Sequence, residues 1–350
     1  MKKVLFLLVF LCNVAIMLGQ GIEFSELTLD QAINKAKQEN KYIFIDFYTN
    51  WCAPCKLMDR DVFPLKELGT YFNPKFINLK INAEKGEEGP ILANKYSIKA
   101  YPTFVILDKN GDLVHMFAGG ILDGEKFINK VRESFNPEVA FGTLKKRFDS
   151  GERSKKLQSA YLQSLINTHT TKVDSLVNEF YDNLNKEEKI SKETVFVFEM
   201  FTPLDSDRFN FLENNRNKFR KVAGAKKIDS ILLSKYESYF ITIVKGYSQD
   251  TSIEELDKVK NHVETLGLSN LKAFPVFEAA ARLKLTKEGK ENVLKKVQNT
   301  IPNLTNNEKD IMLFFIVPGL KKILTQQEKE NLIALVSDEN TKGYIIRSAN

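Results

Sequence analysis

The segment Trp51-Cys-Ala-Pro-Cys-Lys56 contains two cysteines with two residues between them. A thiolate that attacks a disulfide needs a second thiol nearby to resolve the mixed disulfide, and this spacing supplies both. A purely structural disulfide is a weaker interpretation, because so small a loop removes little entropy from the unfolded chain. A zinc site is weaker still, because it needs about four ligands and the histidines stand far apart in the sequence. We therefore predict thiol–disulfide exchange by Cys52 and Cys55, with no metal and no separate cofactor.

The residues around this pair predict a strand before it and a helix after it. The apolar and aromatic run at residues 42–48 is typical of a strand that is covered on both faces. Pro54 suits a first helical turn, and apolar residues follow at helical spacing until Pro64. Cys52 would then stand at the start of the helix, where unpaired N–H groups stabilise a thiolate. Cys52 is accordingly the predicted nucleophile, and Cys55, one turn inside the helix, the resolving cysteine.

Strands and helices continue to alternate as far as about residue 134. The further predicted elements are strands at 76–81, 101–107 and 112–117 and helices at 89–96 and 123–134. Asp108-Lys-Asn-Gly111 has the Asn-Gly tip of a tight hairpin turn, so the last two strands should be antiparallel. The pattern predicts an α/β domain made of a βαβ unit followed by a hairpin and a helix.

Several spaced residues of this region resemble the thioredoxin superfamily. Besides the Cys-x-x-Cys segment, they are Asp46, Lys80, Tyr101-Pro102-Thr103 and Gly119-Gly120. The resemblance spans about residues 24–135 and implies a thioredoxin-like fold. It also implies that Asp46 is buried, pairs with Lys80 and accepts the proton of Cys55, and burial should raise the pKa of Asp46 toward the working pH. The alternative for Asp46 is an exposed acid at a strand end.

The resemblance implies a substrate-binding face beside the cysteines. Its predicted members are Trp51, Pro54, Tyr101, Pro102 and Thr103, with a cis peptide bond before Pro102. For the two aromatic residues, packing inside the fold is an equally good interpretation. The run Cys55-Lys-Leu-Met58 is similar to the exported interchange-reductase branch. Ala-Pro between the cysteines and Tyr101 before the proline depart from the usual residues and bear on substrate choice.

The first twenty residues have the pattern of a secretory signal. Lys2 and Lys3 precede an apolar run from Val4 to Leu18, which is too short for a good bilayer span. We predict cleavage after about residue 20, which would remove Cys12. Lipidation at Cys12 and retention as an uncleaved anchor are less favoured alternatives. The protein is therefore expected to be exported, periplasmic or secreted, with no stable membrane span after cleavage.

From Pro137 onward the periodicity becomes helical, with few convincing strand patterns. The predicted organisation is a signal peptide at 1–20, a thioredoxin-like domain at 21–136 and an all-α domain at 137–350. The all-α domain is expected to consist of helical hairpins, arranged as a solenoid or a bundle. Its apolar segments 196–201 and 311–317 are predicted to be buried helix core rather than partner grooves. We find no catalytic motif in this part and expect it to bind or position a partner.

The overall composition excludes other classes of protein. With 43% hydrophobic and 27% charged residues, the 350-residue chain is globular rather than disordered or fibrous. Its net charge of +6 is mild and spread among acidic and apolar positions, which argues against nucleic acid binding.

These observations predict a protein-disulfide oxidoreductase that acts as a reductase or isomerase in an exported compartment. Its expected partners are protein thiol or disulfide substrates and an unidentified redox partner, and the direction of exchange depends on its redox potential relative to the compartment. The alternative is an adaptor or holdase in which the helical domain carries the function and the thioredoxin-like domain is a scaffold.

Overall fold

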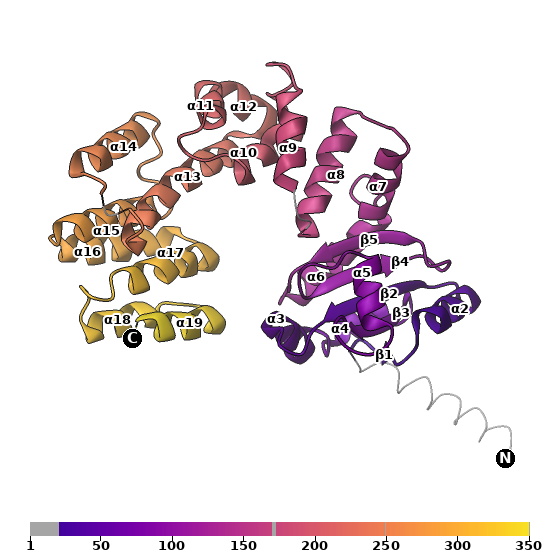
Figure 1. The fold of residues 1–350 in the computed structure, drawn as a ribbon. Helices are drawn as coiled ribbons and strands as arrows, with labels where there is room; N and C mark the ends of the chain where they lie inside the picture. Colours follow the sequence, from indigo (N-terminus) through magenta and orange to yellow (C-terminus); the bar gives the residue numbers. More distant parts are fainter. Residues whose placement is uncertain (1–20, 170–172, 249, 350) are drawn as a thin grey trace, which may run out of the picture. The chain divides into compact units, whose positions relative to one another are not determined.

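A computed structural model describes residues 21–169, 173–248 and 250–349 of the chain (Figure 1). By packing, the chain divides into two compact units, of which the first ends at Asn185 and the second comprises Lys186–Asn350. Each unit has its own buried core. The predicted signal peptide at 1–20 lies outside the described residues.

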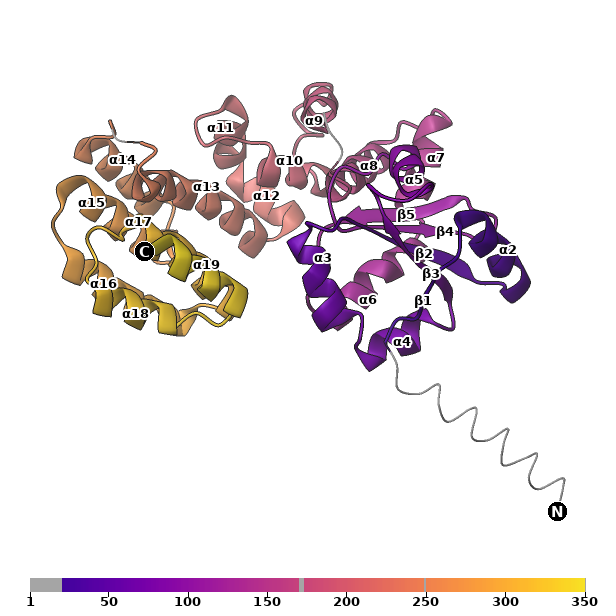
Figure 2. The ribbon, with the colours of Figure 1, turned by 60° about the horizontal axis from the view of Figure 1, so that its bottom comes forward.

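The first unit is built on a five-stranded mixed sheet (Figure 2). The strands are β1 (Phe24–Ser25), β2 (Tyr42–Tyr48), β3 (Phe76–Asn82), β4 (Thr103–Leu107) and β5 (Leu113–Ala118), in the order β1-β3-β2-β4-β5. β1 and β2 run parallel to β3, whereas β4 is antiparallel to β2 and β5 is antiparallel to β4. The predicted βαβ unit and hairpin are thereby confirmed. β4 begins two residues later than predicted, because Pro102 has no N–H to give to the ladder and stays in the preceding loop.

Helices cover both faces of this sheet (Figure 2). In chain order they are α2 (Leu29–Glu39), α3 (Ala53–Leu57) with the π-helical turn Met58–Val62, α4 (Lys66–Phe72), α5 (Gly89–Lys95) and α6 (Gly124–Arg132) with the 3₁₀ turn Glu133–Phe135. Our sequence analysis does not predict α2, although its start is marked. The Thr28 hydroxyl accepts from the Gln31 N–H, and the Gln31 side chain accepts from the Thr28 N–H, which is a capping box.

An aromatic core lies on one face of the sheet. Phe44 and Phe104 of the central strands pack with Phe72 of α4 and Phe127 of α6. The rings of Phe44 and Phe104 stack with centroids 5.7 Å apart, and those of Phe72 and Phe127 stack at 5.7 Å. Because alternate residues of a strand share a face, Asp46 lies on the same face of β2 as Phe44. The strand that leads to the cysteines therefore carries a carboxylate into the core side of the sheet.

Three more helices belong to this unit by packing: α7 (Phe141–Asp149), α8 (Lys155–Asn167) and α9 (Val173–Asp182). α7 lies against β5, where the Phe141 N–H donates to Nδ1 of His115 at 3.1 Å. Burial lowers the pKa of His115 to about 3, so the ring stays neutral and Nδ1 can accept. Packing thus places residues 137–185 with the sheet, whereas our sequence analysis sets the domain boundary after residue 136.

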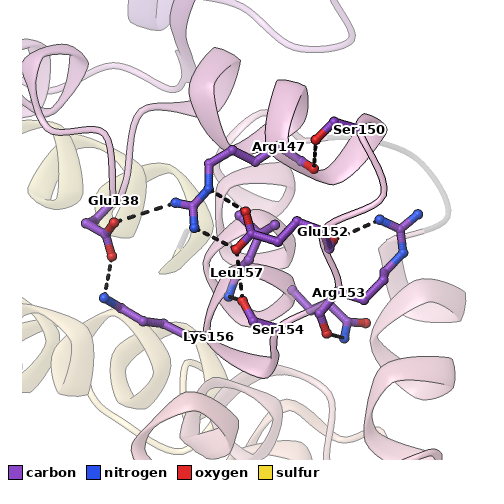
Figure 3. Close-up of polar contacts among 9 residues, drawn as sticks. Glu138, Arg147, Ser150, Glu152, Arg153, Ser154, Lys156 and Leu157 are labelled. Atoms are coloured by element: carbon purple, nitrogen blue, oxygen red, sulfur yellow. Dashed lines mark hydrogen bonds and ion pairs between the residues drawn. The ribbon is translucent and has the colours of Figure 1, made fainter.

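A charged network holds the hairpin of α7 and α8 (Figure 3). The Arg147 guanidinium donates two hydrogen bonds to the Glu152 carboxylate, at 2.7 and 2.9 Å, and lies 3.5 Å from Glu138. Lys156 of α8 pairs with the same Glu138. Because a bidentate arginine–carboxylate pair has a fixed geometry, the network joins the segment before α7 to the turn after it.

We expect Gly142→Ala in α7 to lower the free energy of unfolding of the first unit by about 2 kcal/mol. Alanine normally favours a helix over glycine by about 1 kcal/mol, but a Cβ atom here would stand 2.0 Å from the Leu113 carbonyl oxygen of β5. Trp51, the only tryptophan, reports on this unit by its fluorescence during urea unfolding. Lys146→Ala, an exposed change on the same helix, is the control. If Gly142→Ala leaves the urea unfolding curve unchanged, α7 folds independently of the sheet. That result would agree with a domain boundary after residue 136.

The second unit consists of helices that stack one after another along the chain (Figure 1). They are α10 (Val195–Met200), α11 (Asp207–Asn214), α12 (Arg216–Ala223), α13 (Ala225–Lys245), α14 (Ile253–Thr265), α15 (Phe274–Thr286), α16 (Lys290–Thr300), α17 (Asn306–Gly319), α18 (Gln326–Ala334) and α19 (Glu339–Ala349), with 3₁₀ turns at Lys192–Thr194 and Ile301–Asn303. α13 packs against α12, α15 and α17, and α17 packs against α18 and α19. The predicted fold class, an α/β domain followed by helices, is confirmed.

The two apolar segments of the second unit are helices with buried side chains. In α10, the residues from Val195 to Phe198 are buried, and in α17 the buried apolar residues include Met312 and Ile316. Both segments are therefore helix core, as predicted. Among the described residues, no helix is both long and apolar enough to cross a bilayer.

Candidate active site

The two cysteines form a disulfide at the start of α3. Cys52 is the N-cap residue, and its Sγ atom accepts a hydrogen bond of 3.1 Å from the Cys55 N–H. Both cysteines are 2% exposed, whereas Trp51, Ala53 and Pro54 beside Cys52 are exposed. After reduction, a thiolate on Cys52 would keep this N–H as a donor and face the helix start, which favours negative charge. The geometry therefore distinguishes the two sulfurs, as the sequence predicts.

Asp46 is a buried carboxylate on β2, the strand that precedes the cysteines in the chain. Its side chain is 1% exposed, which excludes the alternative of an exposed strand-end acid. Burial raises the pKa of Asp46 to about 7, while Lys80 lowers it and Asp59 raises it further. Among the residues that the structure describes, its Oδ1 atom has no hydrogen-bond partner. A carboxyl group in this state can take up and release a proton near neutral pH.

The ion pair of Lys80 differs from the one expected. Lys80 is the register neighbour of Asp46 on β3, but its ammonium group pairs with Asp59 of the π-helical turn. A cavity of about 420 Å³ lies at this pair and extends to Phe24 and Phe63. Lys80 thus acts on Asp46 through space rather than by the predicted direct pair. Asp59, four residues after Cys55, is a site residue that our sequence analysis missed.

The Tyr101–Pro102 peptide bond is cis, as predicted. The Pro102 carbonyl accepts from the Gly119 N–H at 2.8 Å, which joins the loop to the end of β5. Thr103 is 1% exposed, and its hydroxyl donates to the Ala100 carbonyl at 2.7 Å. The Thr103 side chain is therefore buried and hydrogen-bonded within the loop, and the predicted substrate contact at Thr103 stays a prediction.

The glycines after β5 lie close to the cysteine helix. Gly119 has a φ of +102°, a conformation that residues with a Cβ rarely adopt. A Cβ atom at Gly120 would stand 3.3 Å from Cβ of Pro54. This loop therefore packs directly on the segment between the two cysteines.

Trp51 forms an exposed rim rather than core packing, since 66% of it is exposed. Its indole N–H donates to both oxygens of Glu84, at 3.0 and 3.1 Å, and its ring meets Tyr101 edge to face at 5.7 Å. Burial and the nearby Glu84 raise the pKa of Tyr101. Glu84 is the second site residue that was not predicted from the sequence. A carboxylate just after a strand that ends beside the cysteines was the available signal.

We expect Glu84→Ala to raise the KM for a protein disulfide about fivefold, because Trp51 loses the hydrogen bonds that orient it. The rate with a small disulfide, which does not need the rim, should change little. The fluorescence maximum of Trp51 should also shift. Glu87→Ala removes an exposed glutamate from the same segment and is the control. Equal KM values for the Glu84 variant and the native protein would show that this rim does not contact the substrate.

The described residues hold no group of three or more His, Cys, Asp or Glu side chains that could bind a metal ion. The arrangement combines a dithiol pair at a helix start, a buried carboxyl with a pKa near 7, and an exposed aromatic rim.

Known proteins are similar to the first unit of this chain. The sequence model of the thioredoxin-like domain matches residues 29–134. Thioredoxin-1 of Drosophila yakuba is 40% identical over 91 residues, which are 26% of this chain and 77% of that protein. Thioredoxin-1 of Caenorhabditis elegans is 34% identical over 103 residues, 29% of this chain and 80% of that protein. The chain therefore belongs to the thioredoxin family.

One solved structure is also similar in sequence to part of this chain. The solution structure of a candidate disulphide-isomerase from Bacteroides thetaiotaomicron is 37% identical and covers 34% of this chain and 96% of that chain, with a TM-score of 0.31. The family match at residues 29–134 lies within the first unit, and the two thioredoxins and this structure each cover about a third of the chain or less.

Proposed function

We propose that this protein is an exported protein-disulfide oxidoreductase that acts as a reductase or isomerase. The observation that supports this most is the Cys52–Cys55 disulfide at a helix start, which follows the strand that carries the buried Asp46. Membership in the thioredoxin family supports thiol–disulfide exchange in general. The proposed export rests on the signal-like pattern of residues 1–20.

In the reducing direction, the Cys52 thiolate attacks one sulfur of a substrate disulfide. A bond forms between Cys52 Sγ and that sulfur, the substrate disulfide breaks, and the other substrate sulfur leaves as a thiolate. Cys55 then loses its proton to Asp46 and attacks Cys52 Sγ, which releases the second substrate thiolate and forms the Cys52–Cys55 disulfide. Two electrons pass from the dithiol to the substrate. An isomerase would return the electrons in a second exchange with the same substrate.

The roles of the charged residues follow from this sequence of steps. Asp46 with a pKa of about 7 is ionised in enough molecules to accept the Cys55 proton and can afterwards release it. Lys80 lowers the pKa of Asp46 and Asp59 raises it. Both residues therefore adjust this pKa and do not themselves take part in the exchange.

The substrate would contact the exposed residues around Cys52. Trp51 and Pro54 are exposed at the start of α3, and Tyr101 borders Trp51 from the opposite loop. The backbone of Tyr101, next to Pro102, is the proposed partner for an extended segment of the substrate. In the adaptor or holdase alternative, the helical domain binds the partner, the thioredoxin-like domain is a scaffold, and no exchange at the cysteines is needed.

A redox titration tests the proposed function. The protein is equilibrated in glutathione buffers of defined composition, free thiols are alkylated, and the oxidised fraction of Cys52–Cys55 is measured by mass. We expect complete and reversible exchange. A reduction potential of the cysteine pair of about −270 mV would support a reductase, and one of about −180 mV would support an isomerase. A pair that stays oxidised, or exchanges no faster than a free disulfide, would favour the adaptor or holdase.

A further inference from the structure

The second unit contains an open cavity that the redox chemistry does not use. It has a volume of about 700 Å³ and lies between α10, the first half of α13, and α17. Cavities of this size are typical of ligand sites. Ser230, Ile231 and Ser234 face it from α13 at helical spacing, with Lys226 and Lys227 at the start of that helix.

The cavity combines an apolar floor with a charged mouth. Ile231 is buried, and Ala223 adds to the apolar surface, whereas Lys226 and Lys227 are exposed. A ligand that fits must therefore bring an apolar group inward and a polar group to the mouth. An extended peptide does so when an acidic residue stands next to an apolar one.

The charges that line the cavity are not balanced. Lys227 lies 3.1 Å from Glu199, and Lys272 lies 3.5 Å from Glu308, so two of the three lining lysines have acidic partners. The third, Lys226, has no ion-pair partner among the residues that the structure describes. One cation at the mouth is thus available to a ligand carboxylate.

The surroundings of the cavity keep this excess of positive charge. Lys235 adds a further cation and donates to the Glu199 carbonyl at 2.8 Å. Glu237, near Lys272, is held back from ionising because burial raises its pKa to about 7. α13 starts at Gly224 without a side-chain cap or an acidic residue in its first turn, so its dipole adds to the positive potential.

We propose that this cavity binds an acidic segment of a partner protein. A carboxylate of the segment meets the ammonium group of Lys226, and a neighbouring apolar side chain rests on Ile231. Binding itself is independent of the cysteines. The further assignment of the bound partner as a disulfide substrate rests on the proposed function.

The test measures binding of a short fluorescein-labelled peptide of alternating glutamate and valine to the full-length protein by fluorescence anisotropy. A peptide with glutamine in place of glutamate reports the neutral case, and unlabelled citrate reports competition by a small anion. Lys226→Glu replaces the available positive charge with a negative one. Because an acidic residue in the first turn of a helix is stabilising, this change should not unfold α13. Lys218→Glu makes the same change on exposed α12, outside the cavity, and is the matched control.

We expect Lys226→Glu to weaken binding of the glutamate peptide at least tenfold and Lys218→Glu less than twofold. The glutamine peptide should bind at least tenfold more weakly than the glutamate peptide. Equal losses in the two variants would show non-specific attraction and overturn the proposal, as would equal binding of the two peptides. Displacement by citrate at concentrations equal to the peptide would assign the cavity to small carboxylate anions instead. Because no cysteine takes part, a protein that binds but does not exchange disulfides would contradict only the proposed function.

Discussion

Cys52→Ser is expected to abolish disulfide exchange, with a loss on the order of a thousandfold or more, because a serine hydroxyl is not ionised at neutral pH. Cys55→Ser should instead stop the reaction after the first step. Its Cys52 thiolate still attacks, but no second thiolate remains to resolve the mixed disulfide. The two variants change one atom each on the same helical segment and so differ in chemistry rather than in fold.

The mixed disulfides can be captured and counted. The reduced Cys55→Ser protein is incubated with a protein disulfide, thiols are alkylated, and conjugates are resolved by non-reducing electrophoresis and mass spectrometry. We expect conjugates linked through Cys52, which reductant releases. The double variant Cys52→Ser/Cys55→Ser should capture nothing. Conjugates formed by Cys52→Ser through Cys55 would reverse the assignment of nucleophile and resolving cysteine.

Asp46→Asn is expected to stabilise the oxidised first unit by about 4 kcal/mol at pH 7.5. The pKa of Asp46 rises from 3.8 to about 7 on folding, and each pKa unit corresponds to about 1.4 kcal/mol. The folded protein therefore keeps a proton on Asp46 over a pH range in which the unfolded chain has released it. Asparagine has nearly the same shape and carries no charge, so the variant avoids this cost.

The sign of the pH dependence identifies the cause. Because folding raises the pKa of Asp46, the free energy of unfolding falls as the pH rises from about 4 to about 7. Above about pH 7 this contribution does not change further. The gain from Asp46→Asn should therefore be full at pH 7.5 and vanish near pH 4. Other titrating groups, His115 among them, are present in both proteins and cancel in the difference.

Urea unfolding followed by Trp51 fluorescence measures this difference at both pH values. Asp112→Asn, a change at an exposed aspartate, is the control and should stay within about 0.5 kcal/mol of the native protein. A gain that is equal at pH 4 and pH 7.5 would show that the effect comes from packing rather than from the buried charge. In kinetics, the same variant should slow resolution by Cys55 and leave the first attack by Cys52 largely intact, if Asp46 is the proton acceptor.

Much of the first unit can be predicted from the sequence because its signals are local. The apolar run at 42–48, the Asn-Gly turn and the spacing of Cys52, Cys55 and Pro102 each depend on a few neighbouring residues. The burial of Asp46 follows from its place in a strand covered on both faces. The capping box of α2 is also local and could have been predicted.

The partners of charged and exposed side chains depend on the tertiary structure instead. Lys80 is in register with Asp46, but its long side chain reaches Asp59 on a helical turn that only folding brings there. Trp51 meets Glu84 because two loops converge at the end of the sheet. No spacing in the sequence encodes either distance.

Two further features also depend on the tertiary structure: how far the first unit extends beyond residue 136, and the cavity in the second unit. Helical periodicity is equal whether a helix packs on a sheet or on other helices, so the sequence determined that residues after 137 are helical but not that α7 lies on β5. Likewise, each lysine of α13 is an ordinary surface residue in the sequence. Only the packing of α10, α13 and α17 gathers them around one cavity and leaves Lys226 unpaired among the described residues, because ion pairs between distant helices are decided by how those helices meet.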